Sequence, residues 1–174
     1  MATFSIRDVT CDDAKELLSI YSHYVLNTAI SFEYDVPTVK EFSKRILHIK
    51  ERFPYVCAVE DRKILGYAYA GAFHPRAAYQ WCAELSIYLR TDAQKSGIGR
   101  ALYEELERRL KAQGILNLYA CIATTTHEDE YLTNNSVHFH SHLGFKICGE
   151  FHKCGKKFDR WYDMVWMEKI IGEH

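Results

Sequence analysis

Apolar positions recur along the chain with two different periods, and the change of period divides it into strands and helices. Alternating or continuous apolar runs predict strands at residues 4–9, 55–60, 64–70, 82–89, 116–123, 145–151 and 162–167. Helical spacing predicts helices at about residues 12–24, 38–49, 97–113 and 136–143. The order β-α-α-β-β-β-α-β-α-β-β predicts an α/β fold of the α+β kind, with a mixed sheet and helices on both faces.

Two segments interrupt the pattern with residues that suit binding. Residues 27–36 have no clear period and are either a substrate loop or a packed connector with Phe32 in the core. In residues 73–81, Arg76 offers a planar guanidinium to a carboxylate or a phosphorus-centred acid, with Tyr79 and Trp81 as walls. The alternative for Arg76 is a solvated surface arginine.

The predicted strand 82–89 carries an acid among apolar neighbours. Glu84 costs free energy there unless it is paired, open to a cleft or protonated, so it is a candidate for chemistry. The following turn contains Gly97 and Gly99 and leads into a helix, whose first N–H groups are unpaired and whose dipole is positive at that end. Lys95 and Arg100 add positive charge beside it. The turn therefore suits a pyrophosphate.

Two later polar segments are interpreted without a binding role. The acidic cluster at residues 127–130 is interpreted as solvated surface, and residues 155–161 as a polar turn before the closing strand. The helix at 136–143 is expected to stop at Gly144 with a glycine cap.

Length and charge narrow the class of protein. A chain of 174 residues fits one domain covering 1–174. The 22 basic and 23 acidic side chains leave no global field that would attract nucleic acid or an anionic membrane. No run of 18 apolar residues occurs, and the amino terminus lacks the features of a signal peptide, so we expect a cytoplasmic protein without a membrane partner.

Cysteine and histidine placement argues against a metal site. The six cysteines include no CxxC pair, and four lie in apolar strand-like runs, so buried free thiols are expected. Cys82 and Cys121 have no histidine base nearby in sequence, which favours structural thiols over nucleophiles. His138, His140 and His142 alternate, but only the first and third share a helix face, so no metal is expected.

The order of elements, with Gln94-x-x-Gly97-x-Gly99 after the fourth strand, resembles the GNAT superfamily of acyl-CoA-dependent N-acetyltransferases. The chain also has Asn134-Asn135-Ser136 and His140-x-x-Leu143-Gly144-Phe145 where that family has its fourth helix and its closing Gly-Phe. The resemblance covers essentially the whole chain. It implies a single acetyltransferase domain at 1–174 that uses acetyl-CoA as co-substrate.

Within that superfamily, the chain is most similar to the phosphinothricin and methionine sulfoximine acetyltransferase branch. Four blocks carry this similarity: Gly66-Tyr67-Ala68-Tyr69-Ala70-Gly71, Pro75-Arg76-Ala77-Ala78-Tyr79-x-Trp81, Glu84-x-Ser86-Ile87-Tyr88 and Lys157-Phe158-x-Arg160-Trp161-x-Asp163. The similarity implies transfer of an acetyl group to the amine of a small molecule, such as an amino acid, phosphinothricin or methionine sulfoximine.

The resemblance also implies the site residue by residue. Glu84 falls at the position of the general base, and the acceptor is expected to contact Phe32, Arg76, Tyr79 and Ser86. Backbone groups of the fourth strand would bind the pantetheine arm, and the turn would wrap the pyrophosphate. The expected cofactor-binding residues of these two segments are Ile87, Tyr88, Leu89, Gln94, Lys95, Ser96, Gly97, Ile98, Gly99 and Arg100.

The chain departs from the branch beside the expected cleft. The segment 124–133 is several residues longer than usual, and Thr133 stands where the family has an asparagine. Asn134 or Asn135 would then take its place as the partner of the pantetheine arm, and the sequence does not distinguish between them. Because the longer loop would lie near the mouth of the cleft, it bears on acceptor specificity.

The mechanism implied is direct attack of a neutral amine on the thioester. Glu84 would take the proton, and partial burial would raise its pKa toward the useful range. His140 stands where many GNAT enzymes have a tyrosine and would protonate the departing thiolate; its alternative role is packing on the fourth helix.

Two other functions remain open for the chain. One is acetylation of a protein or peptide amine, which needs a more open acceptor cleft. The other is a non-catalytic acyl-CoA sensor, against which the presence of Glu84 counts. The branch often forms dimers, so a homodimer is expected, with the aromatic final segment through Trp166 as an apolar contact.

Overall fold

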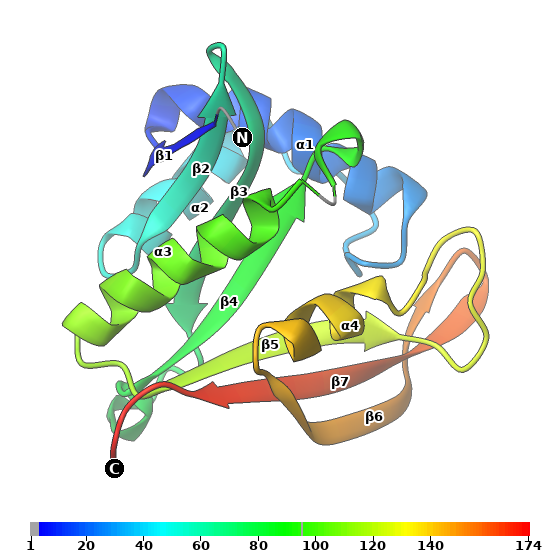
Figure 1. Ribbon diagram of the computed structural model, residues 1–174. Helices are drawn as coiled ribbons and strands as arrows, with labels where there is room; N and C mark the ends of the chain where they lie inside the picture. Colours follow the sequence, from blue (N-terminus) through cyan, green and yellow to red (C-terminus); the bar gives the residue numbers. More distant parts are fainter. Residues whose placement is uncertain (1–3, 95) are drawn as a thin grey trace.

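The computed structural model describes residues 4–94 and 96–174 and has the predicted order of strands and helices (Figure 1). The elements are β1 (Ser5–Asp8), α1 (Ala14–Asn27), α2 (Val39–Lys50), β2 (Tyr55–Glu60), β3 (Lys63–Ala72), β4 (Cys82–Leu89), α3 (Ile98–Ala112), β5 (Asn117–Thr124), α4 (Asn135–His142), β6 (Lys146–Lys157) and β7 (Arg160–Ile170). Short 3-10 turns at Cys11–Asp13, Ala77–Tyr79 and Thr91–Ala93 precede α1, β4 and α3.

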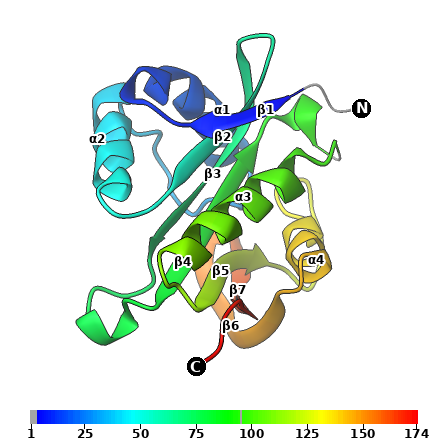
Figure 2. The same cartoon turned by 60° about the vertical axis from the view of Figure 1, so that its left-hand side comes forward.

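The strands form one mixed sheet in the order β1-β2-β3-β4-β5-β7-β6. Only the β4–β5 pair is parallel, because the crossover through α3 returns the chain in the same direction. Helices α1 and α2 cover one face, while α3 and α4 lie on the other (Figure 2). The predicted fold class is therefore confirmed.

Local sequence explains where the helices begin and end. Thr38 and Glu41 form a capping box at the start of α2, in which each side chain accepts a hydrogen bond from the other residue's backbone N–H. Helix α4 is followed by Gly144 at φ 89°, so the predicted glycine cap is present. None of the described helices is both long and apolar enough to cross a membrane.

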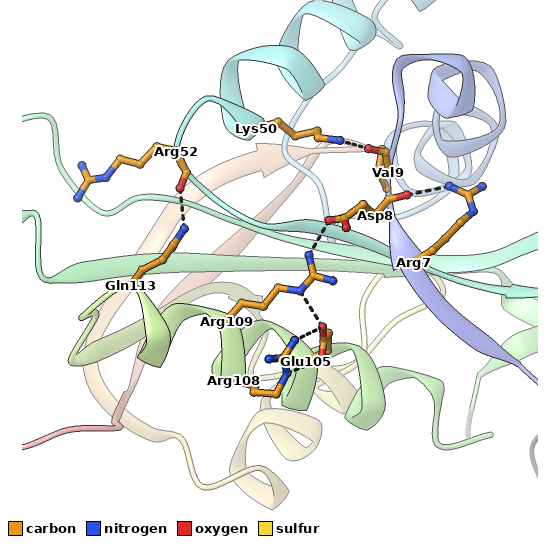
Figure 3. A network of polar contacts seen from close by, with 9 residues as sticks. All are labelled: Arg7, Asp8, Val9, Lys50, Arg52, Glu105, Arg108, Arg109 and Gln113. Carbon is orange, nitrogen blue, oxygen red and sulfur yellow. Dashed lines mark hydrogen bonds and ion pairs between the residues drawn. The ribbon is translucent and has the colours of Figure 1, made fainter.

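A polar network fixes α3 against the edge of the sheet (Figure 3). Arg109 donates to Asp8 of β1 at 2.5 Å and to Glu105 of its own helix at 2.7 Å. Gln113 donates to the carbonyl of Arg52, in the loop between α2 and β2. These contacts lie at the carboxyl-terminal end of α3, so they set the direction in which its amino-terminal end points.

The hairpin between β6 and β7 differs from the sequence prediction. Residues 155–157 belong to strand β6, and only Phe158 and Asp159 form the turn, with φ values of 52° and 59°. Both positive values are those of a two-residue turn whose twist matches that of the flanking strands. The segment is polar because β6 is an edge strand, and polarity alone does not separate such a strand from a turn.

The prediction that the thiols are buried is wrong for most of them. All six cysteines are free, but only Cys57 is buried, and Cys82 is half-buried. The exposed thiols are Cys11, Cys121, Cys148 and Cys154. Three of them lie on β5 or β6, where α1 and α2 do not cover the sheet.

Candidate active site

The sheet opens between β4 and β5, and the opening begins at Glu84. The two strands pair from Cys82 with Asn117 to Glu84 with Tyr119, where the pairing stops. Strand β4 nevertheless stays paired with β3 as far as Leu89. A cavity of about 60 Å³ lies in the opening, lined by Ile30, Leu85, Ser86, Ile87, Tyr88, Tyr103, Ala120, Cys121, Ile122, Ala123, Ser136 and His140.

Glu84 is half-buried at the point where the strands part. Burial raises the pKa of its carboxyl, and no described residue donates a hydrogen bond to it or forms an ion pair with it. Cys121 is exposed to solvent where it lines the cavity, but desolvation by the surrounding protein, and to a smaller extent the charge of Glu84, still raises the pKa of its thiol to about 12. The carboxyl is therefore close to the cavity and free to accept a proton, while Cys121 is a poor nucleophile.

Ser86 follows Glu84 by two residues and so lies on the same face of the sheet. Ser86 is opposite Tyr69 of β3. Burial raises the pKa of the Tyr69 phenol, and the hydrogen bond with the Ser86 hydroxyl lowers it by a smaller amount. Ser86 also lines the cavity. The structure thus places Ser86 on the cavity wall and on the same face of β4 as Glu84.

His140 lies on the cavity wall but is tied to two neighbours. Its Nδ1 donates to the carbonyl of Ser136 at 2.7 Å, and the hydroxyl of Tyr103 lies 2.9 Å from Nε2. Burial lowers the pKa of the imidazole to about 4, so the ring is neutral near pH 7. With Nδ1 as the protonated nitrogen, Nε2 accepts from Tyr103, and His140 has no free proton to donate.

The turn before α3 has the features expected of a phosphate site. Gly97 takes φ 84°, which glycine adopts without strain, and the space where its Cβ would lie is open. The first backbone N–H groups of α3, at Ile98, Gly99 and Arg100, precede the first intrahelical bond, which Ala101 donates to Gly97. The Ser96 hydroxyl donates to the Ala93 carbonyl at 2.6 Å and steadies the turn.

The two glycines of this turn have different physical roles. A Cβ at Gly99 would stand 3.0 Å from the ring of Phe139, so this glycine permits α3 and α4 to pack closely rather than opening space for phosphate. Lys95, predicted to bind the pyrophosphate, lies outside the described residues. Arg100 is exposed and forms a 3.8 Å ion pair with Glu104.

Backbone groups of β4 divide between the two sides of the strand. The hydroxyl of Tyr24 donates to the carbonyl of Leu89 at 2.5 Å and lies 3.3 Å from its amide, so those groups are already bonded. The side chain of Gln94 also interacts with this hydroxyl. Directions alternate along a strand, so Ile87 faces the opening and Tyr88 faces β3. Of the three residues expected to offer backbone groups to the pantetheine arm, Ile87, Tyr88 and Leu89, only Ile87 has such groups free at the opening.

The structure separates the roles of the two asparagines at the start of α4. The Asn134 side chain both donates to and accepts from the backbone of Thr125, so it closes the loop before the helix. Asn135 is the first residue of α4 and is exposed, and its side chain forms no hydrogen bond to any described residue. Only Asn135 is therefore free to meet a ligand.

The expected acceptor residues lie on separate segments around the opening. Tyr79 packs edge-on against Phe73, whose ring stacks on Tyr119, the residue paired with Glu84. Arg76 is exposed, and its guanidinium has no hydrogen-bond or ion-pair partner among the described residues. Phe32 is 39% exposed, which speaks against the alternative of a packed connector with Phe32 in the core.

The acidic cluster of the long loop is structural, which the sequence did not indicate. The Asp129 carboxylate accepts hydrogen bonds from the backbone of Tyr131 and Leu132 and from the Tyr162 hydroxyl, and it pairs with Arg160 at 2.9 Å. The cluster therefore joins the loop to strand β7 instead of lying free in solvent. Residues 4–94 and 96–174 contain no group of three or more His, Cys, Asp or Glu side chains that could hold a metal.

Comparison with known proteins identifies the family. Residues 6–166 match the acetyltransferase (GNAT) domain. The chain is 31% identical to phosphinothricin N-acetyltransferase of Streptomyces coelicolor over 98% of each chain, and 32% identical to the L-methionine sulfoximine/L-methionine sulfone acetyltransferase of Pseudomonas aeruginosa over 94% of this chain and 92% of that one.

A solved structure shares both the fold and the sequence. The crystal structure of phosphinothricin acetyltransferase from Sinorhizobium meliloti in complex with acetyl-CoA superposes with a TM-score of 0.89 at 35% identity, covering 98% of this chain and 90% of that one. The chain belongs to the GNAT family of acetyl-CoA-dependent N-acetyltransferases.

Proposed function

We propose that the chain transfers the acetyl group of acetyl-CoA to the amine of a small amino acid or amino-acid analogue, such as phosphinothricin or methionine sulfoximine, with Glu84 as general base. The observation that carries the proposal is the half-buried Glu84 carboxyl at the opening of the sheet, with a raised pKa and no hydrogen-bond donor among the described residues. The substrates named for the relatives supply the acceptor class.

The residues present fit acetyl-CoA. The open turn at Gly97 and the free N–H groups of α3 suit its pyrophosphate, while the unpaired side of β4 at Ile87 suits the amides of its pantetheine arm. Asn135 offers a further free amide at the start of α4.

The reaction follows from this arrangement. The neutral amine attacks the thioester carbon, a C–N bond forms, and the C–S bond breaks as the thiolate leaves. Glu84 takes the amine proton directly or through water, since burial raises the pKa of its carboxyl and so makes it a stronger base. The thiolate takes its proton from water, because the Tyr103 hydroxyl already donates its proton to His140 Nε2 and burial raises the pKa of that phenol.

A panel of amines tests the proposal. Purified protein is incubated with acetyl-CoA and with phosphinothricin, methionine sulfoximine, methionine sulfone, ordinary amino acids or short peptides, and the N-acetyl products are measured by liquid chromatography. We expect turnover with one or more of the small amino-acid-like amines. Turnover with peptides alone would instead favour a protein or peptide acceptor.

The same assay examines Glu84. Glu84→Gln should bind acetyl-CoA as the native chain does and lower turnover by at least about 10²-fold, because positioned proton transfer is lost. Calorimetric titration with acetyl-CoA is the binding control. Native turnover in this variant would exclude Glu84 as the base.

A further inference from the structure

A short part of β6 holds the segment that connects α1 to α2, although the two are far apart in sequence. The Nζ of Lys157 donates to the carbonyl of Ser31 at 2.6 Å. The hydroxyl of Tyr34 donates to the carbonyl of Lys156, also at 2.6 Å. These two bonds fasten the connector, residues 28–38, on both sides of Phe32.

The ring of Phe32 lies directly on Gly155. An added Cβ at Gly155 would stand 2.2, 2.5 and 2.7 Å from three atoms of that ring, distances that real side chains do not reach. The backbone of Gly155 is not in the left-handed region, so no turn requires a glycine at this position. The missing side chain instead makes room for the Phe32 ring.

The position of Lys157 supports a specific role for this contact. It is only 5% exposed, and burial lowers the pKa of its amine against the opposing charge of Glu33. A buried charge costs free energy unless it is hydrogen-bonded, so its bond to the Ser31 carbonyl fixes how β6 and the connector align.

Phe32 belongs to the same connector as a residue of the cavity wall. Ile30, two residues earlier, lines the cavity. Cys154, next to Gly155, is near enough to Cys121 on the cavity wall to contribute to its raised pKa, as does Glu84. The Phe32 ring is 39% exposed, lies against β6 at Gly155, and follows the cavity wall at Ile30 by two residues.

We propose that Gly155 is a specificity-determining position for acetyl transfer, because the missing side chain lets β6 hold the Phe32 ring at the acceptor side of the cavity. Lys157 is the positioning residue that holds the backbone beside the ring. This inference rests on the proposed function, because it assumes that the acceptor is a small amine. It adds β6 to the elements that determine acceptor specificity.

The test is Gly155→Ala, with Gly149→Ala as its matched control. Both glycines lie on β6, but a Cβ at Gly149 would meet only the Phe151 ring, at an ordinary 3.7 Å. We expect Gly155→Ala to raise the acceptor KM about tenfold by moving the ring, and to leave the KM for acetyl-CoA unchanged. Gly149→Ala should leave both constants at native values; an unchanged acceptor KM in Gly155→Ala would overturn the proposal.

A double-mutant cycle separates this role from general damage to the strand. In a Phe32→Ala background the ring is absent, so Gly155→Ala should have no further effect on the acceptor KM. Equal effects in the two backgrounds would show that Gly155 acts through β6 itself and would contradict the proposal.

A readout without turnover keeps the inference independent of the proposed function. With 4-fluorophenylalanine incorporated, the fluorine resonance of Phe32 is identified by its loss in Phe32→Leu. That resonance should shift in Gly155→Ala and stay in place in Gly149→Ala. An inactive native chain would refute the proposed acceptor class, whereas an unshifted resonance would refute the role of Gly155.

Discussion

Two glutamates close to the acceptor side have opposite electrostatic environments. Glu33 accepts a hydrogen bond from Tyr21 and pairs with Arg45 at 2.7 Å, and these contacts lower its pKa despite partial burial. Glu84 has burial without a compensating donor among the described residues, and its pKa is raised. Glu33 is thus held ionised as a structural acid, whereas Glu84 binds a proton more readily than an ordinary glutamate.

The pH dependence of kcat/KM should reveal this difference. Catalysis needs Glu84 ionised and the amine neutral, so both requirements are lost as pH falls. For an acceptor amine of pKa about 8, log kcat/KM should rise with a slope of about 2 below the pKa of Glu84 and about 1 between the two pKa values. In Glu84→Gln the steeper limb should disappear, and its persistence would assign that limb to another group.

Unfolding provides the control for that variant. The folded-state pKa of Glu84 lies above its unfolded value, so its ionised form opposes folding at every pH above the unfolded pKa. Removing the charge should therefore leave Tm unchanged or raise it at pH 7. A large drop in Tm would mean that the loss of turnover reflects unfolding.

At the level of elements, α3 joins the cofactor turn to the structural network of the sheet edge. Its first residues form the expected pyrophosphate site, and Arg109 near its end reaches β1 through Asp8 (Figure 3). Arg108, one residue earlier, pairs only with Glu105 on the same helix and is 68% exposed. The two arginines thus differ in whether they connect elements.

Replacing each arginine measures that difference. Arg109→Met keeps the apolar stem but removes the link between α3 and β1, and it should lower the free energy of unfolding by about 1 kcal/mol in urea titrations. Arg108→Met should unfold at the native midpoint, because an exposed pair within one helix contributes little. Equal midpoints for the two variants would show that the link to β1 does not stabilise the fold.

At the level of the whole molecule, the β6–β7 hairpin exposes large apolar side chains at the edge of the sheet. Ile147, Phe151 and Trp161 are 48%, 50% and 58% exposed. Trp166, expected to contribute to a contact between chains, packs against Phe73 within the chain and is half-buried. Apolar surface gathered on an edge strand favours association with another copy.

We therefore expect a homodimer, which analytical ultracentrifugation would detect as twice the mass of one chain. Phe151→Lys should shift the protein toward the monomer, because it places a charge in the apolar surface. Leu47→Lys, at a similarly exposed position on α2, should leave the dimer intact. A native chain that is monomeric at high concentration would contradict this expectation.

The sequence by itself determined the order of elements, the turn before α3 and the place of Glu84 in its strand. Each depends on neighbours within one or two turns of chain: the apolar period of α3, the glycines of its first turn and the apolar residues around the acid. Such signals are local, so they are present before the chain folds.

Only the tertiary structure decided how the site is assembled. Tyr103 and His140 are 37 residues apart, and Ser31 and Lys157 are 126 apart, so no periodicity links either pair. The parting of β4 and β5 at Glu84, and the place of residues 155–157 in an edge strand, likewise depend on pairing with distant strands. Hydrogen-bond partners and burial are properties of the packed chain, and they set the pKa of Glu84 and the position of Phe32.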